Sequence, residues 1–159
     1  GATFWNADLS NATLKNAYLV NATLASANLA QADLENSDLS MTDFSFANLP
    51  NANLSGANLG GSKLYRARLT GANLSQAAVD NVHMSWVDLS RSNLEGADLN
   101  HSALWSSDLS RTNLRLTDLS WTILTRANFD HADLTGAILL KASLVYSNLG
   151  GAKLNQSIF

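Results

Sequence analysis

Few residues of this sequence could do chemistry, and their spacing does not assemble a catalytic centre. There are three histidines and no cysteines among 159 residues. The pairs Gly60-Gly61 and Gly150-Gly151 are not followed by the Lys-Ser/Thr of a phosphate-binding loop. An enzyme needs a nucleophile beside a base, or paired carboxylates, converging in a cleft. The sequence therefore predicts a protein that is not an enzyme and holds no cofactor and no metal.

A period of five residues determines the structural elements that position every side chain. Every fifth residue from Phe4 to Phe159 is apolar, and Leu fills 26 of these 32 central positions. Two residues before the centre stands Ala, Ser or Thr in 30 of 32 cases, and the residue between is Asp or Asn in 18. Neither a helix nor a plain strand has this period. The pattern predicts a solenoid in which each five-residue unit forms one side of a coil and points one large and one small side chain inward.

Units such as Ala57-Asn58-Leu59, Ala72-Asn73-Leu74 and Ala97-Asp98-Leu99 make the chain resemble the pentapeptide-repeat family, whose motif is A-(D/N)-L-x-x. The resemblance covers the whole chain. It implies an all-β fold, a right-handed quadrilateral parallel β-helix with four units per coil and roughly eight coils. We expect residues 1–159 to form a single domain. A start at Gly1 rather than Met is compatible with a domain excised from a larger protein.

Stacking residues that lie twenty apart gathers aromatic side chains on one side of the expected rod. This first side has its centres at Phe4 and at every twentieth residue up to Leu144. Six of the eight outward aromatic side chains fall on it, and a seventh lies at the corner leading into it. The three histidines fall on three different sides and cannot share a metal. The predicted interaction surface consists of Trp5, Phe46, Tyr65, Arg66, Trp86, Trp105, Trp121, Arg126 and Tyr146.

One interpretation of this surface is that its side chains stabilise one another. Phe46, Arg66 and Trp86 would stack as a cation–π ladder with a spacing of about 4.8 Å. Arg126 and Tyr146 would form a second stack of the same kind. In this interpretation the aromatic residues serve the fold itself.

The other interpretation is a recognition surface for a protein partner or for a second copy of the chain. Aromatic residues and Arg are the favoured anchors of interfaces. Trp5, Tyr65 and Trp105 have no obvious partner in the expected stacks, which favours this second interpretation. The sequence thus predicts a protein-interaction scaffold or docking module that uses its aromatic side.

Mimicry of DNA is the main alternative function. Some members of the family imitate DNA and bind type II topoisomerases such as gyrase, which gives resistance to quinolone drugs. Duplex DNA carries one charge per ~1.7 Å, whereas this chain has a net charge of only −3. Asp98 would stack on Asp118, and Asp88 on Asp108, with arginines beside the latter pair. The sequence has no basic stripe, so it does not predict direct binding to nucleic acid.

The remaining expectations concern location and assembly. No apolar run is long enough to insert into a membrane and no signal-peptide pattern opens the chain, which favours a cytoplasmic protein. A domain of an effector or of a membrane-linked protein is the alternative. The end coils at Phe4 and Phe159 carry no cap, so end-to-end dimerisation is a second route to assembly. The least regular stretch, 78–87, predicts a local bulge or a join between two halves.

Overall fold

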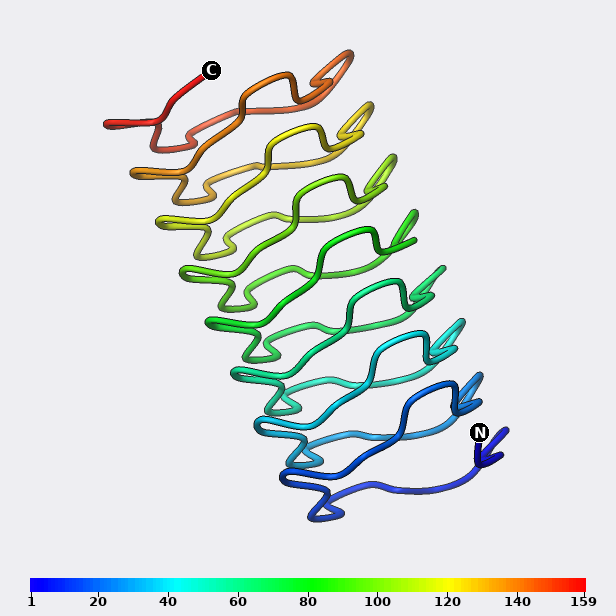
Figure 1. Ribbon diagram of the computed structural model, residues 1–159. Helices are drawn as coiled ribbons and strands as arrows, with labels where there is room; N and C mark the ends of the chain where they lie inside the picture. Colours follow the sequence, from blue (N-terminus) through cyan, green and yellow to red (C-terminus); the bar gives the residue numbers. More distant parts are fainter.

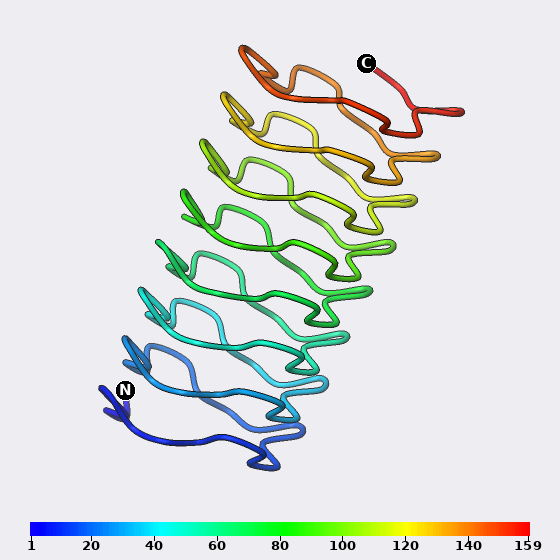
Figure 2. The same ribbon diagram turned by 180° about the vertical axis from the view of Figure 1, so that it is seen from behind.

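The computed structural model describes all 159 residues as a rod of stacked coils, with the two chain termini at opposite ends of the rod (Figure 1). The view from behind shows the same regular stacking (Figure 2). The chain contains no helix, and therefore none that could cross a membrane. It also has no extended strand: turns of two residues alternate with single residues in parallel bridges.

The bridges define the register of the coils. Each joins residues twenty positions apart, from Thr3 with Thr23 to Ile138 with Ile158. Twenty residues are four units, so each coil has four sides, and the expected right-handed quadrilateral parallel β-helix is confirmed. The sides are named first to fourth in chain order. Their first centres are Phe4, Leu9, Leu14 and Leu19.

Backbone hydrogen bonds tie each unit to both neighbouring coils. In the unit centred on Leu64, the N–H of Lys63 donates to the coil before it. The N–H groups of Leu64 and Arg66 donate to the coil after it. The N–H of Ala67 then closes the turn onto the carbonyl of Leu64 at 3.0 Å. This pattern leaves one backbone donor per unit, the residue just after the centre, without a backbone acceptor.

Every turn places its third residue in the left-handed region. The φ angle lies between 55° and 72° at 31 such positions, and 25 of them hold a residue other than Gly. A type II turn requires this positive φ. For most L-residues the left-handed conformation costs ~1–2 kcal/mol, and Asn and Gly tolerate it best. Large side chains at this place in the unit therefore work against the turn.

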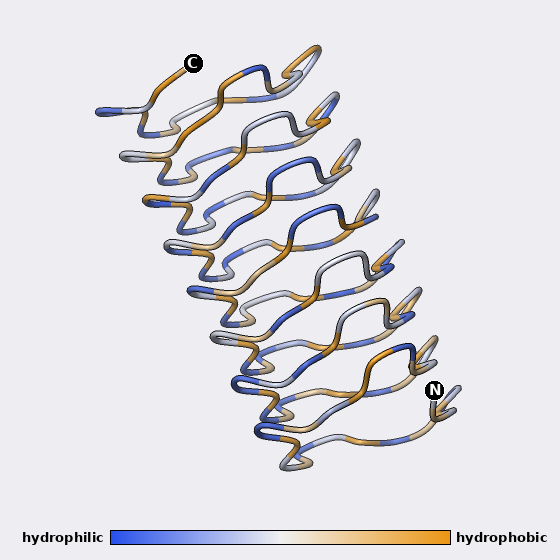
Figure 3. Ribbon diagram, in the orientation of Figure 1, coloured by the Kyte–Doolittle hydropathy of each residue, from blue (hydrophilic) through white to orange (hydrophobic).

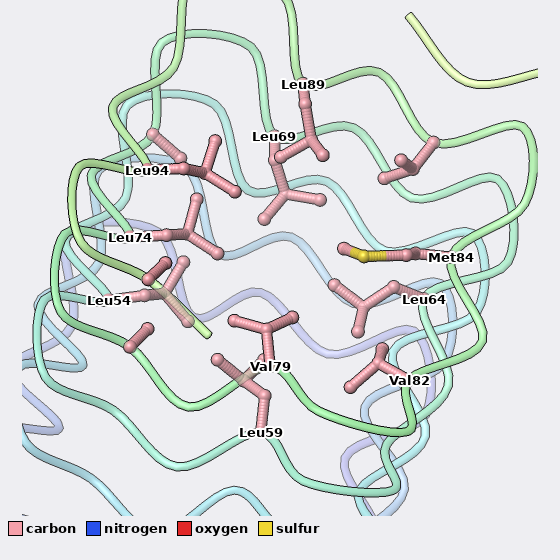
Figure 4. Close-up of a cluster of buried hydrophobic side chains, with 14 of the residues drawn as sticks. Leu54, Leu59, Leu64, Leu69, Leu74, Val79, Val82, Met84, Leu89 and Leu94 are labelled. Atoms are coloured by element: carbon pink, nitrogen blue, oxygen red, sulfur yellow. The ribbon is translucent and has the colours of Figure 1, made fainter. Parts of the chain in front are cut away.

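The large central side chains meet inside the coils. Leu54, Leu59, Leu64 and Leu69 come from four consecutive sides and point into a common interior (Figure 4). All centres from Leu24 to Leu139 are at most 2% exposed. Hydropathy therefore changes repeatedly along each coil as residues alternate between the interior and the surface (Figure 3). The inward pair of large and small side chains is the predicted one.

The irregular stretch 78–87 differs from the rest of the rod by one opened turn. The N–H of Val82 donates to Oγ of Ser102 at 2.9 Å, and that hydroxyl donates to the carbonyl of Val79 at 2.6 Å. A hydroxyl is thus inserted where all other turns close directly. The bridges continue through this stretch without a change of register, so they give no sign of a join between halves.

Candidate interaction surface

The structure brings five of the predicted surface residues into one chain of contacts. Phe46 meets Tyr65 edge to face, with ring centroids 5.5 Å apart, and Trp86 meets Trp105 in the same way at 5.4 Å. Between these pairs, the guanidinium carbon of Arg66 lies 5.5 Å from the Tyr65 ring and 5.7 Å from the Trp86 ring. These five residues are named the aromatic ladder below.

The ladder differs in three details from the expected stacks. Arg66 lies against Tyr65 and Trp86, and no cation–π contact joins it to Phe46. Tyr65 and Trp105 do have partners, because they pack against the turn residue of an adjacent coil. Arg126 and Tyr146 form no cation–π pair, and Tyr146 is 82% exposed. Trp5 contacts no other aromatic ring and is 67% exposed. Of the exposed aromatic residues on this side, only Trp5 and Tyr146 therefore lack an aromatic or cationic partner, whereas the rings of the ladder have one.

Trp121 belongs to a second, shorter stack at the corner before the first side. The ring of His101 lies nearly parallel to it, with an interplanar angle of 12° and centroids 5.8 Å apart. The ammonium of Lys141 lies 4.0 Å from the Trp121 ring centroid on the coil that follows. The predicted surface thus contains two preformed stacks and three freely exposed side chains, Trp5, Arg126 and Tyr146.

The Asp or Asn before each centre has a structural role that sequence reasoning missed. In 17 of these 18 units its side-chain oxygen accepts the leftover N–H two residues later, as Asn93 Oδ1 does from Glu95 at 3.2 Å. Asn48 is the exception because Pro50 has no N–H, and Asn48 Oδ1 is buried without a partner. The signal was available in the sequence, since Asx side chains commonly bond the backbone two residues on.

The first side lacks this capping in seven of its eight units. Only Asp43 precedes a centre there, and it accepts the N–H of Ser45 at 2.9 Å. The N–H groups of Tyr65, Ser85 and Trp105 donate to no atom of the protein. The indole N–H groups of the ladder and its guanidinium also make no hydrogen bond within the chain. Unused donors are therefore concentrated where the aromatic rings are.

The charge of the first side also differs from that of the rest of the rod. Lys63, Arg66 and Arg126 lie on it, Lys141 lies at the corner leading into it, and Asp43 is its single acid. None of these four cations forms an ion pair, whereas four ion pairs are formed elsewhere. Because the whole chain has a net charge of −3, the remaining surface is acidic.

The acidic residues form short pairs rather than long columns. Asp88 bridges to Asp108, and Asp98 bridges to Asp118, one coil apart in each case. Both pairs end after these two coils, because the bridged neighbours on either side are not acidic. The structure thus places the expected acidic pairs as predicted and extends neither of them along the rod.

Besides Asp8, whose pKa is lowered mainly by hydrogen bonds from Ser10, two carboxyl groups have pKa values below the ordinary value. Partial burial of Asp88 opposes ionisation, but hydrogen bonds from Ser90 and Thr70 and the nearby charge of Arg68 lower its pKa. For Asp133, the hydrogen bond from the Thr135 hydroxyl is the main cause of the lowered pKa. Both groups lie outside the first side.

The surface of the rod offers neither a pocket nor a metal cluster. No pocket opens anywhere along it, and no group of three or more His, Cys, Asp or Glu is placed to hold a metal ion. His83 lies on the first side and His101 at the corner before it. His131 lies on the second side, where its Nδ1 approaches the carboxylate of Asp130 at 2.9 Å.

These features define a β-helical repeat protein with a regular outer surface and no pocket. The sequence matches the family of Pentapeptide repeats in eight copies, over segments that include 2–40, 27–66, 37–76, 67–105, 92–129 and 122–159. The chain therefore belongs to the pentapeptide-repeat family.

Solved structures place it within that family. HetL, a pentapeptide repeat protein involved in heterocyst differentiation regulation from the cyanobacterium Nostoc sp. strain PCC 7120, is 35% identical. Its TM-score is 0.96, and the match covers 98% of this chain and 71% of HetL. The similarity to HetL therefore extends along nearly the whole rod described here.

Two further structures are similar to a lesser degree. QnrB1, a plasmid-mediated fluoroquinolone resistance protein, is 21% identical, with a TM-score of 0.47 and coverage of 95% of this chain and 79% of QnrB1. A pentapeptide repeat protein from the Arabidopsis thaliana thylakoid lumen is 28% identical, with a TM-score of 0.30 and coverage of 74% and 64%. These two similarities carry no argument about function. Among curated proteins, no relative matches the chain.

Proposed function

We propose that this protein is a non-enzymatic protein-interaction scaffold whose contact surface is the aromatic ladder together with Trp5, Trp121, Arg126 and Tyr146. The observation that carries the proposal is the coincidence of exposed aromatic rings and unused hydrogen-bond donors on one side of the rod. Interfaces are enriched in aromatic residues and Arg, and Trp and Tyr combine a large apolar surface with a polar group. On the other three sides, Asp and Asn side chains cap the corresponding N–H in 16 of 24 units, against one of eight on the first side.

The turn geometry supports a role for these residues outside folding. Phe46, Arg66 and Trp86 occupy left-handed turn positions, with φ between 55° and 62°. Asn or Gly would adopt this conformation at lower cost. A smaller residue is sufficient for the same turn on the same side, as Ser26 and Ser106 show. The fold therefore does not require aromatic side chains at this place in the unit.

The test is a double variant, Trp86→Ser with Trp105→Ser, compared with the wild type. Serine occupies the same two columns naturally, so we expect an unchanged circular dichroism spectrum. Light scattering first shows whether the wild type is a monomer or a dimer. A dimer that the variant converts to a monomer would identify a second copy of the chain as the partner.

If the wild type is a monomer, capture experiments with cell extract follow. We expect the captured protein to be lost with the double variant and kept with Tyr18→Ser, which removes an exposed aromatic residue from another side. Equal capture by all three proteins would contradict the proposal. Inhibition of gyrase supercoiling that disappears when Asp98 and Asp118 become Asn would instead favour DNA mimicry.

A further inference from the structure

We propose that the first side binds an extended acidic segment of a protein partner, with two carboxylates four residues apart and an apolar residue midway. The inference rests on the proposed function and specifies the chemistry of the partner. Four observations support it: the unpaired backbone N–H groups, the position of the Arg66 guanidinium, the net charge of the first side and the spacing of the coils.

The backbone N–H groups without an acceptor in the chain are available to acceptors from outside it. On the second, third and fourth sides together, Asp and Asn side chains cap the N–H that follows the centre in 16 of 24 units. On the first side the same N–H is uncapped at the exposed residues Tyr65 and Trp105, and also at Ser85 between them, which is itself buried. A carboxylate from a partner would supply the acceptor that the chain's own Asp or Asn supplies elsewhere. Bonds from N–H groups to a charged acceptor are stronger than those to a neutral one.

Arg66 is positioned to bind such a carboxylate. Its guanidinium lies between the rings of Tyr65 and Trp86 and forms no ion pair or hydrogen bond within the protein. A guanidinium has five donors in a planar fork that matches a carboxylate in two-point contact. Because the two rings restrict its position, little side-chain freedom remains to be lost on binding.

The charge of the first side favours an acidic partner over a second copy. Three cations and one acid lie on it, and Lys141 and Asp80 lie at the corner before it. Face-to-face pairing of two copies would place these like charges against each other, which weakens association. An acidic segment meets the opposite charge instead. The indole rings between the cations would contact its apolar side chain.

The spacing of the cations selects an extended conformation. Arg66 and Arg126 stand in the same column three coils apart, which is about 14 Å along the rod at ~4.8 Å per coil. An extended chain covers that distance in four residues at ~3.4 Å each, and residues i, i+2 and i+4 share one face. The middle residue would then lie over Trp86 and Trp105. A helix would need about nine residues for this length, which puts the two acids on opposite faces.

The experiment uses short fluorescent peptides of equal length, measured by anisotropy against the full chain at low ionic strength. One peptide has two Glu four residues apart with Phe midway. The second has the same residues with the two Glu three apart, and the third replaces both Glu by Gln. We expect the first peptide to bind tightest and the Gln peptide to bind about tenfold more weakly, since about 1.4 kcal/mol is a factor of ten.

A matched pair of variants tests the role of Arg66. Arg66→Gln should weaken the first peptide about fivefold, because a charge-assisted contact is lost. Arg91→Gln, on another side, should leave binding unchanged. Gln occurs naturally at this turn position at Gln31 and Gln76, so both variants should fold.

Several results would overturn the inference: no binding of any peptide, equal binding of the acidic and Gln peptides, equal or tighter binding of the spacing-three peptide, or tighter binding of labelled oligothymidylate. The Trp86→Ser/Trp105→Ser variant separates this failure from failure of the proposed function. A Gln peptide that binds the wild type and not this variant would remove the acidic specificity while keeping the aromatic surface. Peptide binding that neither variant reduces would overturn both.

Discussion

The third and first sides of the rod are built from the same five-residue unit but differ in whether their polar groups form hydrogen bonds within the chain. On the third side, each Asn from Asn53 to Asn113 donates its amide to the side-chain oxygen one coil earlier, starting from Asp33, at 2.9 to 3.2 Å. Each of those oxygens also caps a turn N–H. The residues Asp33, Asn53, Asn73, Asn93 and Asn113 are named the amide ladder.

On the first side, the corresponding position holds Lys63, His83, Ala103 and Ile123, and none of them caps the turn. The backbone register is the same on both sides. The coil therefore tolerates the loss of these caps. The amide ladder satisfies its donors internally, whereas the aromatic side leaves backbone donors without an acceptor in the chain.

The largest effect on stability should come from breaking the amide ladder. Asn73→Ala removes the amide donated to Asn53, the acceptor for Asn93 and the cap for Ser75. At about 1 kcal/mol for each lost hydrogen bond, unfolding in urea should become easier by ~2–3 kcal/mol. Lys63→Ala, at the same unit position of the first side, should change the free energy of unfolding by less than ~0.5 kcal/mol. Equal losses in the two variants would remove the distinction between the sides.

A smaller effect of opposite sign is expected on the second side. Pro50→Ala restores an N–H for the buried Asn48 Oδ1 and reproduces the bond of Ala30 to Asn28 one coil earlier. An unsatisfied buried acceptor costs ~1–3 kcal/mol, and removing Pro costs ~0.4–1 kcal/mol through the freer unfolded chain. We expect a net gain of about 1 kcal/mol in thermal or urea unfolding. The gain should vanish when Asn48 is also replaced by Ala, and its persistence there would refute the explanation.

Acid should weaken the third side through Asp133, the carboxyl that follows Asn113 in the same column. The hydroxyl of Thr135, its N–H and Lys153 lower the pKa of Asp133 against slight burial. A folded-state pKa below the unfolded value of ~3.9 stabilises the protein above about pH 5, and this contribution is lost as pH falls through the folded value. We expect the free energy of urea unfolding of Asp133→Asn to fall less than that of the wild type as the pH is lowered from about 5 through the folded-state pKa of Asp133. An equal sensitivity would exclude Asp133 as a source.

The smallest effect should come from the corner stack beside the aromatic side. Lys141→Gln removes the ammonium from the Trp121 ring but keeps the left-handed turn, where Gln also occurs. An exposed cation–π contact is worth ~0.5–1 kcal/mol, so the free energy of unfolding should fall by no more than that. Trp fluorescence during unfolding measures it. A loss as large as that of Asn73→Ala would make the corner stack part of the structural framework.

The sequence was sufficient to predict the rod, because one strict period dictates its core. Leu or another apolar residue at each centre and a small residue two before it leave no other packing. The same stacking of residues twenty apart correctly placed Arg66 beside Trp86. It gave the wrong result for Arg126 and Tyr146, although their spacing is identical. Arg66 has Tyr65 in its own unit to hold the guanidinium, whereas Arg126 follows Thr125.

Other contacts depend on details that a period does not contain. The edge-to-face pair of Trp86 and Trp105 joins different columns of adjacent coils, so it depends on side-chain rotamers. The orphaned oxygen of Asn48, in contrast, could have been predicted from Pro50 once the role of Asx residues was recognised. The chemistry proposed for a partner could not be predicted from the sequence, since it is argued from the donors that the folded chain leaves without an acceptor.

The most direct test of the account is the free energy of urea unfolding of Trp86→Ser/Trp105→Ser beside that of the wild type. If the aromatic ladder is maintained for recognition, the loss should not exceed ~1.5 kcal/mol, the upper value for an edge-to-face pair, and should stay below that of Asn73→Ala. A loss equal to or greater than that of Asn73→Ala would show that the ladder holds the coils together, and would contradict its assignment as a surface kept for a partner.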